Sequence, residues 1–297
     1  MIALTRGHPQ PGARADEPIA IPRQPGESIY PDWMRPRPAV GPPRISGTAM
    51  PGGVFMSVGT DRTAGDTWLL LTGLSIAALG SGAMVLTYVV SWLLEQAWSL
   101  PLTPMLLMVP TSRLEAETAP WLQIVINLLM ILSFLVLMRI SPLSGYHAAE
   151  HKVISAIEHF GEPTMDGARQ MPRAHRRCGS NLLAGLLPLL LFAQPLWSID
   201  PVAGAAVIIL GWGLRFHTGY LIQATFATKE PTDRQLRAGL EAGRKILRLW
   251  RERQGQPVAP LVSIWRRGLI QMFVGMMAGL SLANWIYSHY LHLWLDF

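Results

Sequence analysis

The sequence has a single cysteine and few charged residues. Cys178 is the only cysteine in 297 residues, which excludes a disulfide within the chain and is typical of a reducing compartment. Charged residues make up 15% of the chain, whereas half of its residues are hydrophobic and the mean hydropathy is +0.27. This composition favours a membrane protein over a soluble globular domain.

Charge is absent from long stretches of the chain. Residues 68–94 carry none, and at about 1.5 Å per residue they can cross about 30 Å of hydrocarbon. Residues 121–138 and 268–290 are also expected to span. Two further segments, 181–197 and 201–221, are separated by only three residues and form either a transmembrane hairpin or a re-entrant pair. We therefore predict an all-α polytopic membrane protein with about five transmembrane helices, of which the third and fourth form a short hairpin or a re-entrant pair, plus cytoplasmic helices.

Basic residues gather in every second loop. All but two of the 25 Lys and Arg residues lie in segments 1–67, 139–180 and 222–267. The positive-inside rule places these segments in the cytoplasm, so we expect a multi-pass protein of the bacterial inner membrane with a cytoplasmic N-terminus and an external C-terminus. The basic residues are spread over juxtamembrane loops, which indicates contact with the bilayer and its anionic headgroups rather than with nucleic acid. The sequence leaves open whether the protein forms a homo-oligomer or binds another membrane protein.

We expect neither a secretory signal nor internal repeats in the chain. Residues 1–50 hold ten of the 24 prolines and no basic start followed by an apolar core, so we expect a disordered cytoplasmic tail. Without a fixed repeat period, a duplicated transporter has no support. The expected domains are this tail, a membrane domain at 51–255 with cytoplasmic motif loops, and a C-terminal transmembrane helix at 256–297.

Residues 229–254 predict a basic amphipathic helix. Thr232 and Gln235 have the spacing of a capping box, and Leu236, Leu240 and Leu247 fall on one face of the helix. This helix is expected either to lie on the inner leaflet or to pack onto the other cytoplasmic loops.

Titratable residues are concentrated in GYHAAEHKVISAIEHF, residues 145–160. A helix would place His147, Glu150 and His151 on one face, because residues three and four apart are neighbours on a helix. The pattern H-x-x-E-H is that of inverted zincin sites. Imidazoles bind metal, and a nearby carboxylate can either bind the metal or accept a proton from water, which predicts Glu150 as the catalytic residue.

The loop AHRRCGSN, residues 174–181, supplies two more candidate ligands. His175 and Cys178 have H-x-x-C spacing, and their side chains suit zinc or, less well, iron. Arg177 beside the thiol would lower its pKa. An isolated H-x-x-E-H match is more often a solvated helix face, and a lone cysteine more often a small buried hydrophobe. Their joint occurrence on one predicted membrane face favours a metal.

Three motifs in order, GYHAAEHKVISAIE, HRRCGSN and IQATFATKEPTDRQL, resemble the YqhQ-like family of bacterial integral membrane proteins. This family is a domain of unknown function (1385) whose members are often labelled predicted metal-dependent enzymes, and the resemblance covers about residues 52–247. In this chain Arg176 stands in place of a usual proline and Asn181 in place of an apolar residue. The resemblance implies that the family's motif residues are His147, Glu150, His151, Lys152, Glu158, Arg177, Cys178, Gly179, Thr228, Glu230 and Pro231.

We therefore expect a metal site at the cytoplasmic face, with zinc as the first choice of divalent metal, and a metal-dependent hydrolase as one function. The expected ligands are His147, His151, His175 and Cys178, with Lys152, Glu158, Arg177 and Glu230 in support. A structural or regulatory membrane protein with a closed polar or metal cluster is the alternative, so enzyme status is left open. A cysteine nucleophile with a histidine base also fits. Transport ranks lowest because Arg215 is the only charged residue in the apolar segments.

Overall fold

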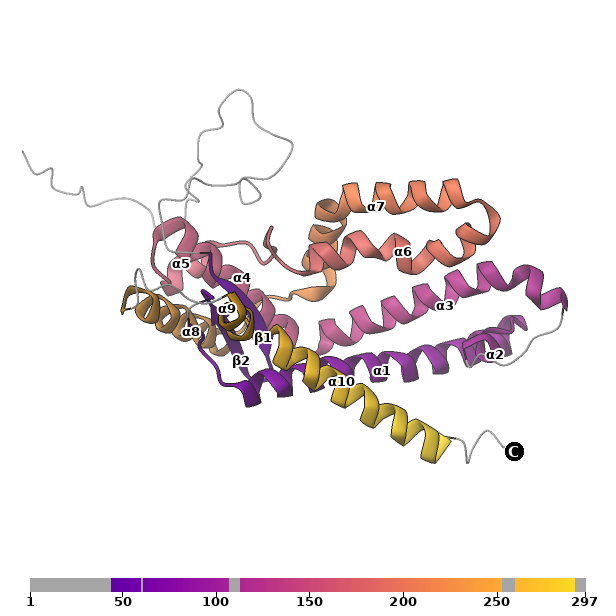
Figure 1. Cartoon of the computed structure of the whole chain (residues 1–297), viewed down its shortest axis with the longest axis horizontal. Coiled ribbons are helices and arrows are strands. Elements are labelled where there is room, and N and C mark those ends of the chain that lie inside the picture. The colour runs from indigo at the N-terminus through magenta and orange to yellow at the C-terminus, as the bar shows by residue number, and fades with distance from the viewer. Residues whose placement is uncertain (1–43, 60, 107–112, 253–259, 292–297) are drawn as a thin grey trace, which may run out of the picture. The chain divides into compact units, whose positions relative to one another are not determined.

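The structure, a computed structural model, describes residues 44–59, 61–106, 113–252 and 260–291 (Figure 1). Most of the expected tail, residues 1–43, lies outside the described residues. Residues 46–50 of that expected tail instead form strand β1 (Ser46–Met50), which pairs antiparallel with β2 (Gly53–Ser57). The all-α polytopic prediction is confirmed for the described chain, with this one hairpin added to it. The division at residues 255 and 256 stays a prediction.

Five long helices correspond to the five apolar segments. Four contain stretches long and apolar enough to cross a membrane: Asp66–Trp98 in α1 (Asp66–Trp98), Trp121–Ile140 in α3 (Arg113–Ile140), Pro201–Ala227 in α7 (Pro201–Ile222) with η2 (Gln223–Ala227), and Leu269–Tyr290 in α10 (Leu269–Ile286) with η3 (Tyr287–Leu291). The fifth helix, α6 (Ser180–Ile199), offers a shorter apolar stretch, Ser180–Phe192. It packs along α7 as the first half of a hairpin.

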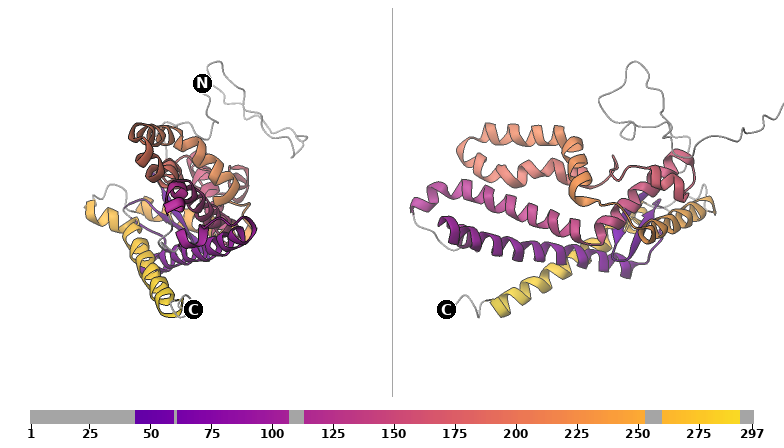
Figure 2. Two further views of the ribbon diagram at one scale, coloured as in Figure 1. Left: turned by 90° about the vertical axis from the view of Figure 1, so that its right-hand side faces the viewer. Right: turned by 180° about the vertical axis from the view of Figure 1, so that it is seen from behind.

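The long helices lie side by side in the order α10, α1, α3, α6 and α7 (Figures 1 and 2). At the crossing of α1 and α10, a Cβ on Gly275 would lie 2.1 Å from the carbonyl oxygen of Leu70. Gly73 has the same relation to Met272, at 2.0 Å from its carbonyl oxygen. Glycines therefore allow these two backbones to touch, which is a common way for membrane helices to associate.

Most of the remaining helices gather with the hairpin at one end of the long helices (Figure 1). They are α4 (Leu143–Phe160), α5 (Met165–Gln170) and α8 (Asp233–Glu252), with α9 (Pro260–Arg266) just before α10. The short helix α2 (Leu102–Leu106) instead follows α1 at the opposite end. The capping box of α8 is present, since the backbone N–H of Thr232 donates to Gln235 Oε1 at 2.9 Å and that of Gln235 to Thr232 Oγ1 at 3.3 Å.

The core of this end lies between α4, α8 and β2. Leu236, Leu240 and Leu247 of α8 are buried against Val153 and Ile157 of α4. The amphipathic helix therefore packs onto its neighbours, which is the second of the two placements that its sequence allows. Burying these side chains fixes the rotation of α4 and so decides which way its polar face points.

Candidate metal centre

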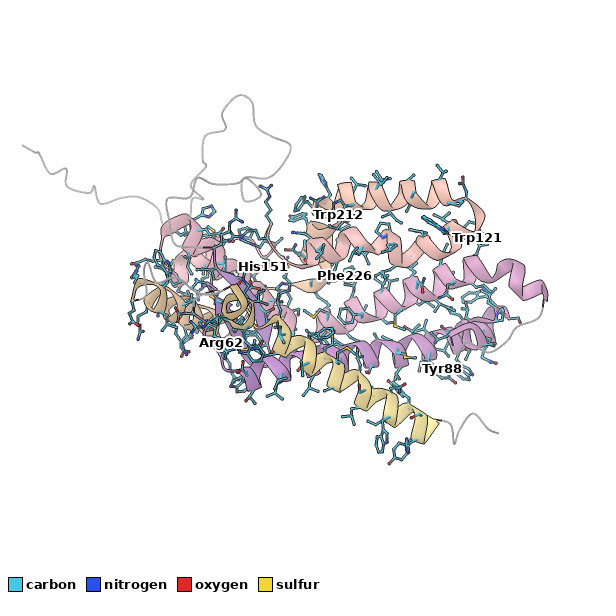
Figure 3. The ribbon with its side chains drawn as sticks, in the orientation of Figure 1. Arg62, Tyr88, Trp121, His151, Trp212 and Phe226 are labelled. Atoms are coloured by element: carbon cyan, nitrogen blue, oxygen red, sulfur yellow. The ribbon has the colours of Figure 1, made fainter. Side chains whose placement is uncertain are left out.

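α4 carries three of the candidate side chains on one side. His147, Glu150 and His151 occupy positions three and four apart, as the helical spacing predicts, while Ala149 and Val153 face the core. Glu150 and His151 are buried, and His147 is partly buried. Figure 3 shows His151 at the end of the long helices that lies away from Tyr88 and Trp121.

Cys178 meets the two histidines of α4, and it lies 31 positions after His147 in the sequence. Its Sγ lies 3.2 Å from His147 Nε2. One donor atom from each of His147, His151 and Cys178 lies within 4.8 Å of the other two. Glu150 is next to them, with Oε2 at 3.9 Å from Nε2 of both histidines. Two imidazoles, a thiol and a carboxylate therefore converge on one small volume.

Backbone carbonyls orient both imidazoles. His147 Nδ1 lies 3.0 Å from the carbonyl oxygen of Ala227, and His151 Nδ1 lies 2.5 Å from that of Arg173. A carbonyl only accepts, so each Nδ1 donates its proton to the backbone, and Nε2 of each ring is turned towards Cys178. His151 Nε2 is buried and has no hydrogen-bond partner among the described residues. This orientation by a second hydrogen bond is typical of metal-binding histidines.

The thiol of Cys178 lies at the beginning of α6. The backbone N–H and the hydroxyl of Ser180 donate to its Sγ at 3.5 and 3.1 Å, and a helix N-terminus favours a thiolate. Burial on its own would raise the pKa of Cys178, but the neighbouring His147 and His151 bring it well below its ordinary value. Burial would likewise lower the pKa of His147, and the Cys178 thiolate and Glu150 raise it to about 9.

His175 lies beside this group rather than in it. Its Nδ1 accepts the backbone N–H of Arg177 at 3.3 Å, and its Nε2 faces Glu158 Oε2 at 3.5 Å. Burial lowers the pKa of His175. Glu158 also pairs with the guanidinium of Arg177. His175, Glu158 and Arg177 therefore brace the loop that presents Cys178.

Lys152 and Glu230 support the site from further away. Lys152 Nζ lies 3.1 Å from Glu230 Oε1 and donates to the carbonyl of Arg169 at 3.1 Å, and Arg173 Nε lies 3.7 Å from Glu230 Oε2. These contacts hold residues 169–173, whose last carbonyl orients His151. Lys152 and Glu230 thus support the cluster by holding this loop in place, and they do not contact the donor atoms.

A buried amide pair that the sequence reasoning missed holds the other side of the loop. Gln223 Oε1 accepts the backbone N–H of His175 at 2.7 Å, and its Nε2 donates to Asn181 Oδ1 at 2.9 Å. Asn181 Nδ2 in turn donates to the carbonyl of Arg176 at 2.6 Å. Gln223 begins the π-helix η2, whose last residue, Ala227, orients His147. Short π-helices often occur at functional sites, and a glutamine at the end of an apolar helix was the available signal.

Strand β1 passes directly over Glu150. A Cβ on Gly47 would lie 2.6 Å from both Cγ and Oε1 of Glu150, so glycine allows the strand to approach this carboxylate. The turn of the hairpin contains Pro51, Gly52 and Gly53, with a φ of +90° at Gly52. A Pro-Gly-Gly sequence between two short apolar runs is a recognisable hairpin signal.

The donor set fits a metal ion. Two imidazole nitrogens and a thiolate sulfur form a ligand set that suits zinc, and three protein ligands with an open position are typical of catalytic zinc sites. A cation would also provide a partner for the buried Nε2 of His151, which otherwise costs desolvation energy. His147, His151 and Cys178 could therefore hold a metal, with Glu150 as the nearest further donor.

Comparison with known proteins places the cluster in a family. The family model described as "Protein of unknown function (DUF1385)" matches residues 58–210, which include α4 and Cys178. The "Uncharacterized protein YqhQ" of Bacillus subtilis (strain 168) is 30% identical over 151 residues, which cover 41% of this chain and 47% of that protein. The chain thus spans about half the length of this relative. No solved structure matches.

Proposed function

The chain belongs to the DUF1385 family, and from the geometry of its polar cluster we propose that it is a membrane-embedded metal-dependent hydrolase. The observation that carries this proposal is the convergence of donor atoms from His147, His151 and Cys178 within 4.8 Å of one another. In addition, His151 Nε2 is buried and has no hydrogen-bond partner among the described residues. The basic loops support a site on the cytoplasmic side of the bacterial inner membrane.

Glu150 is the general base in this proposal. A zinc ion held by His147, His151 and Cys178 would supply a Lewis acid for the oxygen that gains charge during the reaction. Glu150 takes a proton from a water molecule, whose oxygen bonds to the carbonyl carbon or phosphorus of an ester, amide or phosphoester. The bond to the leaving group breaks, and Glu150 returns the proton to that group. The net reaction is hydrolysis without oxidation or reduction.

A cysteine hydrolase is the second candidate. The 3.2 Å between Cys178 Sγ and His147 Nε2, together with the lowered pKa of Cys178, favours an imidazolium and thiolate pair. In that case the thiolate itself would attack the carbonyl carbon of an ester or amide, and the alcohol or amine would leave with the proton of His147. Water would then hydrolyse the acyl-cysteine, which releases the acid and restores the thiolate and the imidazolium. This candidate needs no metal, so metal content distinguishes the two.

Elemental analysis of the purified full chain in detergent tests the proposal. We expect about one equivalent of zinc in the wild type and a loss of most of it in His151→Ala and Cys178→Ala. Glu150→Gln should keep its zinc, because this residue is the base and not one of the three ligands. His159→Ala is the matched control, since His159 lies on the same helix outside the cluster. Equal, near-zero zinc in all samples would contradict a metalloenzyme.

Alkylation of Cys178 gives an independent readout. Iodoacetamide should modify this only cysteine quickly in protein stripped of metal and slowly after zinc is restored, because a coordinated thiolate is a poor nucleophile. The cysteine hydrolase predicts equal rates with and without zinc. A structural metal site predicts that stripping also unfolds the protein, which the thermal unfolding midpoint would reveal.

A further inference from the structure

A cavity of about 880 Å³ extends from the cluster into the apolar part of the molecule. His147, Glu150 and Cys178 line one end, and β1 covers that end. The long helices α1, α3 and α6 supply the other walls, with side chains such as Ile76 and Phe134. The volume is within the usual range for small-ligand sites.

The walls run deep into the spanning helices. The lining residues of α1 extend from Thr72 to Ala83, which is roughly 16 Å at the rise of an α-helix. That length is about half of the hydrocarbon thickness of a bilayer. Both residues belong to the candidate span Asp66–Trp98, so an occupant of this part of the cavity has to be apolar over most of its length.

The cavity continues onto the lipid-facing surface of α6. Leu183 and Leu190 line it, yet they are 62% and 57% exposed. Exposed leucines on a helix beside transmembrane spans face hydrocarbon, because water does not reach that depth. An apolar molecule could therefore enter sideways from the bilayer rather than from the aqueous phase.

The polar end of the cavity is cationic. Arg44, Arg177 and Arg267 line it, and Glu150 is the only carboxylate among its described lining residues. Arg177 pairs with Glu158, whereas Arg44 and Arg267 make no ion pair within the described part of the chain. Arginines without carboxylate partners at a cavity end favour a phosphate group.

We propose that the cavity binds a membrane lipid with a phosphate headgroup. Its hydrocarbon chains lie between α1, α3 and α6, its phosphate lies against Arg44 and Arg267, and the bond to be hydrolysed lies beside Glu150. This inference names the substrate class of the proposed hydrolase and so rests on that function. We favour a lipid over a soluble phosphate ester because the apolar walls extend deep into the spanning helices.

Gly80 offers a way to fill the cavity without disturbing the fold. It lines the cavity, and a Cβ added to it would meet no heavy atom within 4 Å. In Gly80→Leu the new side chain should occupy the space meant for the lipid chains. Gly213→Leu is the matched control, because Gly213 lies in α7, has the same open surroundings and does not line the cavity.

Binding to the full chain in detergent can be measured by native mass spectrometry with three probes. Dioctanoyl phosphatidic acid should bind at least about tenfold more tightly than dioctanoylglycerol, which lacks the phosphate, and than glycerol 3-phosphate, which lacks the chains. Gly80→Leu should weaken binding of the phosphatidic acid at least about tenfold, and Gly213→Leu should leave it unchanged.

A second pair of variants tests the headgroup contact. Arg44→Gln should weaken binding of the phosphatidic acid about tenfold while leaving dioctanoylglycerol unchanged, because a charge-assisted hydrogen bond to phosphate is lost. Arg248→Gln, on the exposed side of α8, should change neither.

Three results would overturn the lipid site. They are equal affinity for the two dioctanoyl lipids, an affinity for glycerol 3-phosphate equal to that for dioctanoyl phosphatidic acid, or unchanged phosphatidic acid binding in Gly80→Leu. Zinc measured in the same samples separates this failure from that of the proposed function. Wild-type protein with zinc but without selective lipid binding refutes the substrate class alone. Selective lipid binding without zinc supports the lipid site and refutes the metal-dependent chemistry.

Discussion

His147, His151 and His175 differ in the ring atom that the backbone engages. In the first two, Nδ1 donates to a carbonyl, which leaves Nε2 as the donor atom for a metal. In His175, Nδ1 accepts an N–H, so Nε2 carries the proton and turns to Glu158. The same residue type therefore has two roles within one site, and the local hydrogen bond decides which.

Gln223 gives a prediction at the scale of one residue. Gln223→Leu would leave the backbone N–H of His175 and the Oδ1 of Asn181 without their partner. We expect the free energy of unfolding to fall by about 1–3 kcal/mol. Zinc affinity should fall about 10–100-fold, because the loop carrying Cys178 loses its support. Chemical unfolding in detergent and competition with a zinc chelator measure these two effects.

Thr225→Ala is the control for this variant. Thr225 is exposed in the same π-helix, and its hydroxyl donates to the carbonyl of Leu221 within the same continuous helical segment. We expect a change within about 0.5 kcal/mol and no change in zinc affinity. If both variants lost zinc equally, the role assigned to Gln223 would be wrong.

At the scale of helices, the contact between α1 and α10 depends on glycine. In Gly275→Ala the new Cβ would lie 2.1 Å from the Leu70 carbonyl oxygen, so the two helices have to separate. We expect a loss of about 1–3 kcal/mol in the free energy of unfolding, as for other overpacked sites. Unfolding in mild detergent measures it.

The matched substitution Gly213→Ala should have the opposite sign. Gly213 lies within α7, and a Cβ there meets no heavy atom within 4 Å. Replacing a helical glycine with alanine without a clash stabilises by about 0.5–1 kcal/mol. A destabilisation of similar size in both variants would show that general helix effects, and not the crossing with α1, explain the result.

At the scale of the whole chain, the elements that hold the cluster gather at one end of the long helices (Figure 1). This arrangement agrees with the shared side that the basic loops predict for segments 139–180 and 222–267. Arg248 of α8 is at this end, and Tyr290, beyond α10, is at the far end of the last span. Which end faces the cytoplasm stays a prediction.

Cysteine labelling tests this orientation. In a Cys178→Ala background, a membrane-impermeant maleimide should label Tyr290→Cys in intact cells and Arg248→Cys only after the membrane is permeabilised. Both positions are exposed, so accessibility within the protein does not limit the reaction. The reverse pattern would place the cluster outside the cell.

The sequence by itself determined the properties that depend on neighbouring residues. A charge-free run as long as 68–94 is long and apolar enough to cross a membrane, and the structure places it within one continuous helix, α1. Helical spacing put His147, Glu150 and His151 on one face, and the Thr232 and Gln235 pair marked the beginning of α8. These are local regularities, which one segment contains in full.

Only the tertiary structure decided which distant groups meet. Cys178 joins His147 across 31 positions, whereas the Nε2 of His175, three residues before Cys178, faces Glu158. In the sequence both residues are equally good candidate metal ligands. Gly47 lies over Glu150 because strand β1, whose residues were expected to belong to a disordered tail, packs against α4. Such contacts depend on how helices and strands pack against one another, and periodicity within a segment carries no information about its neighbours in space.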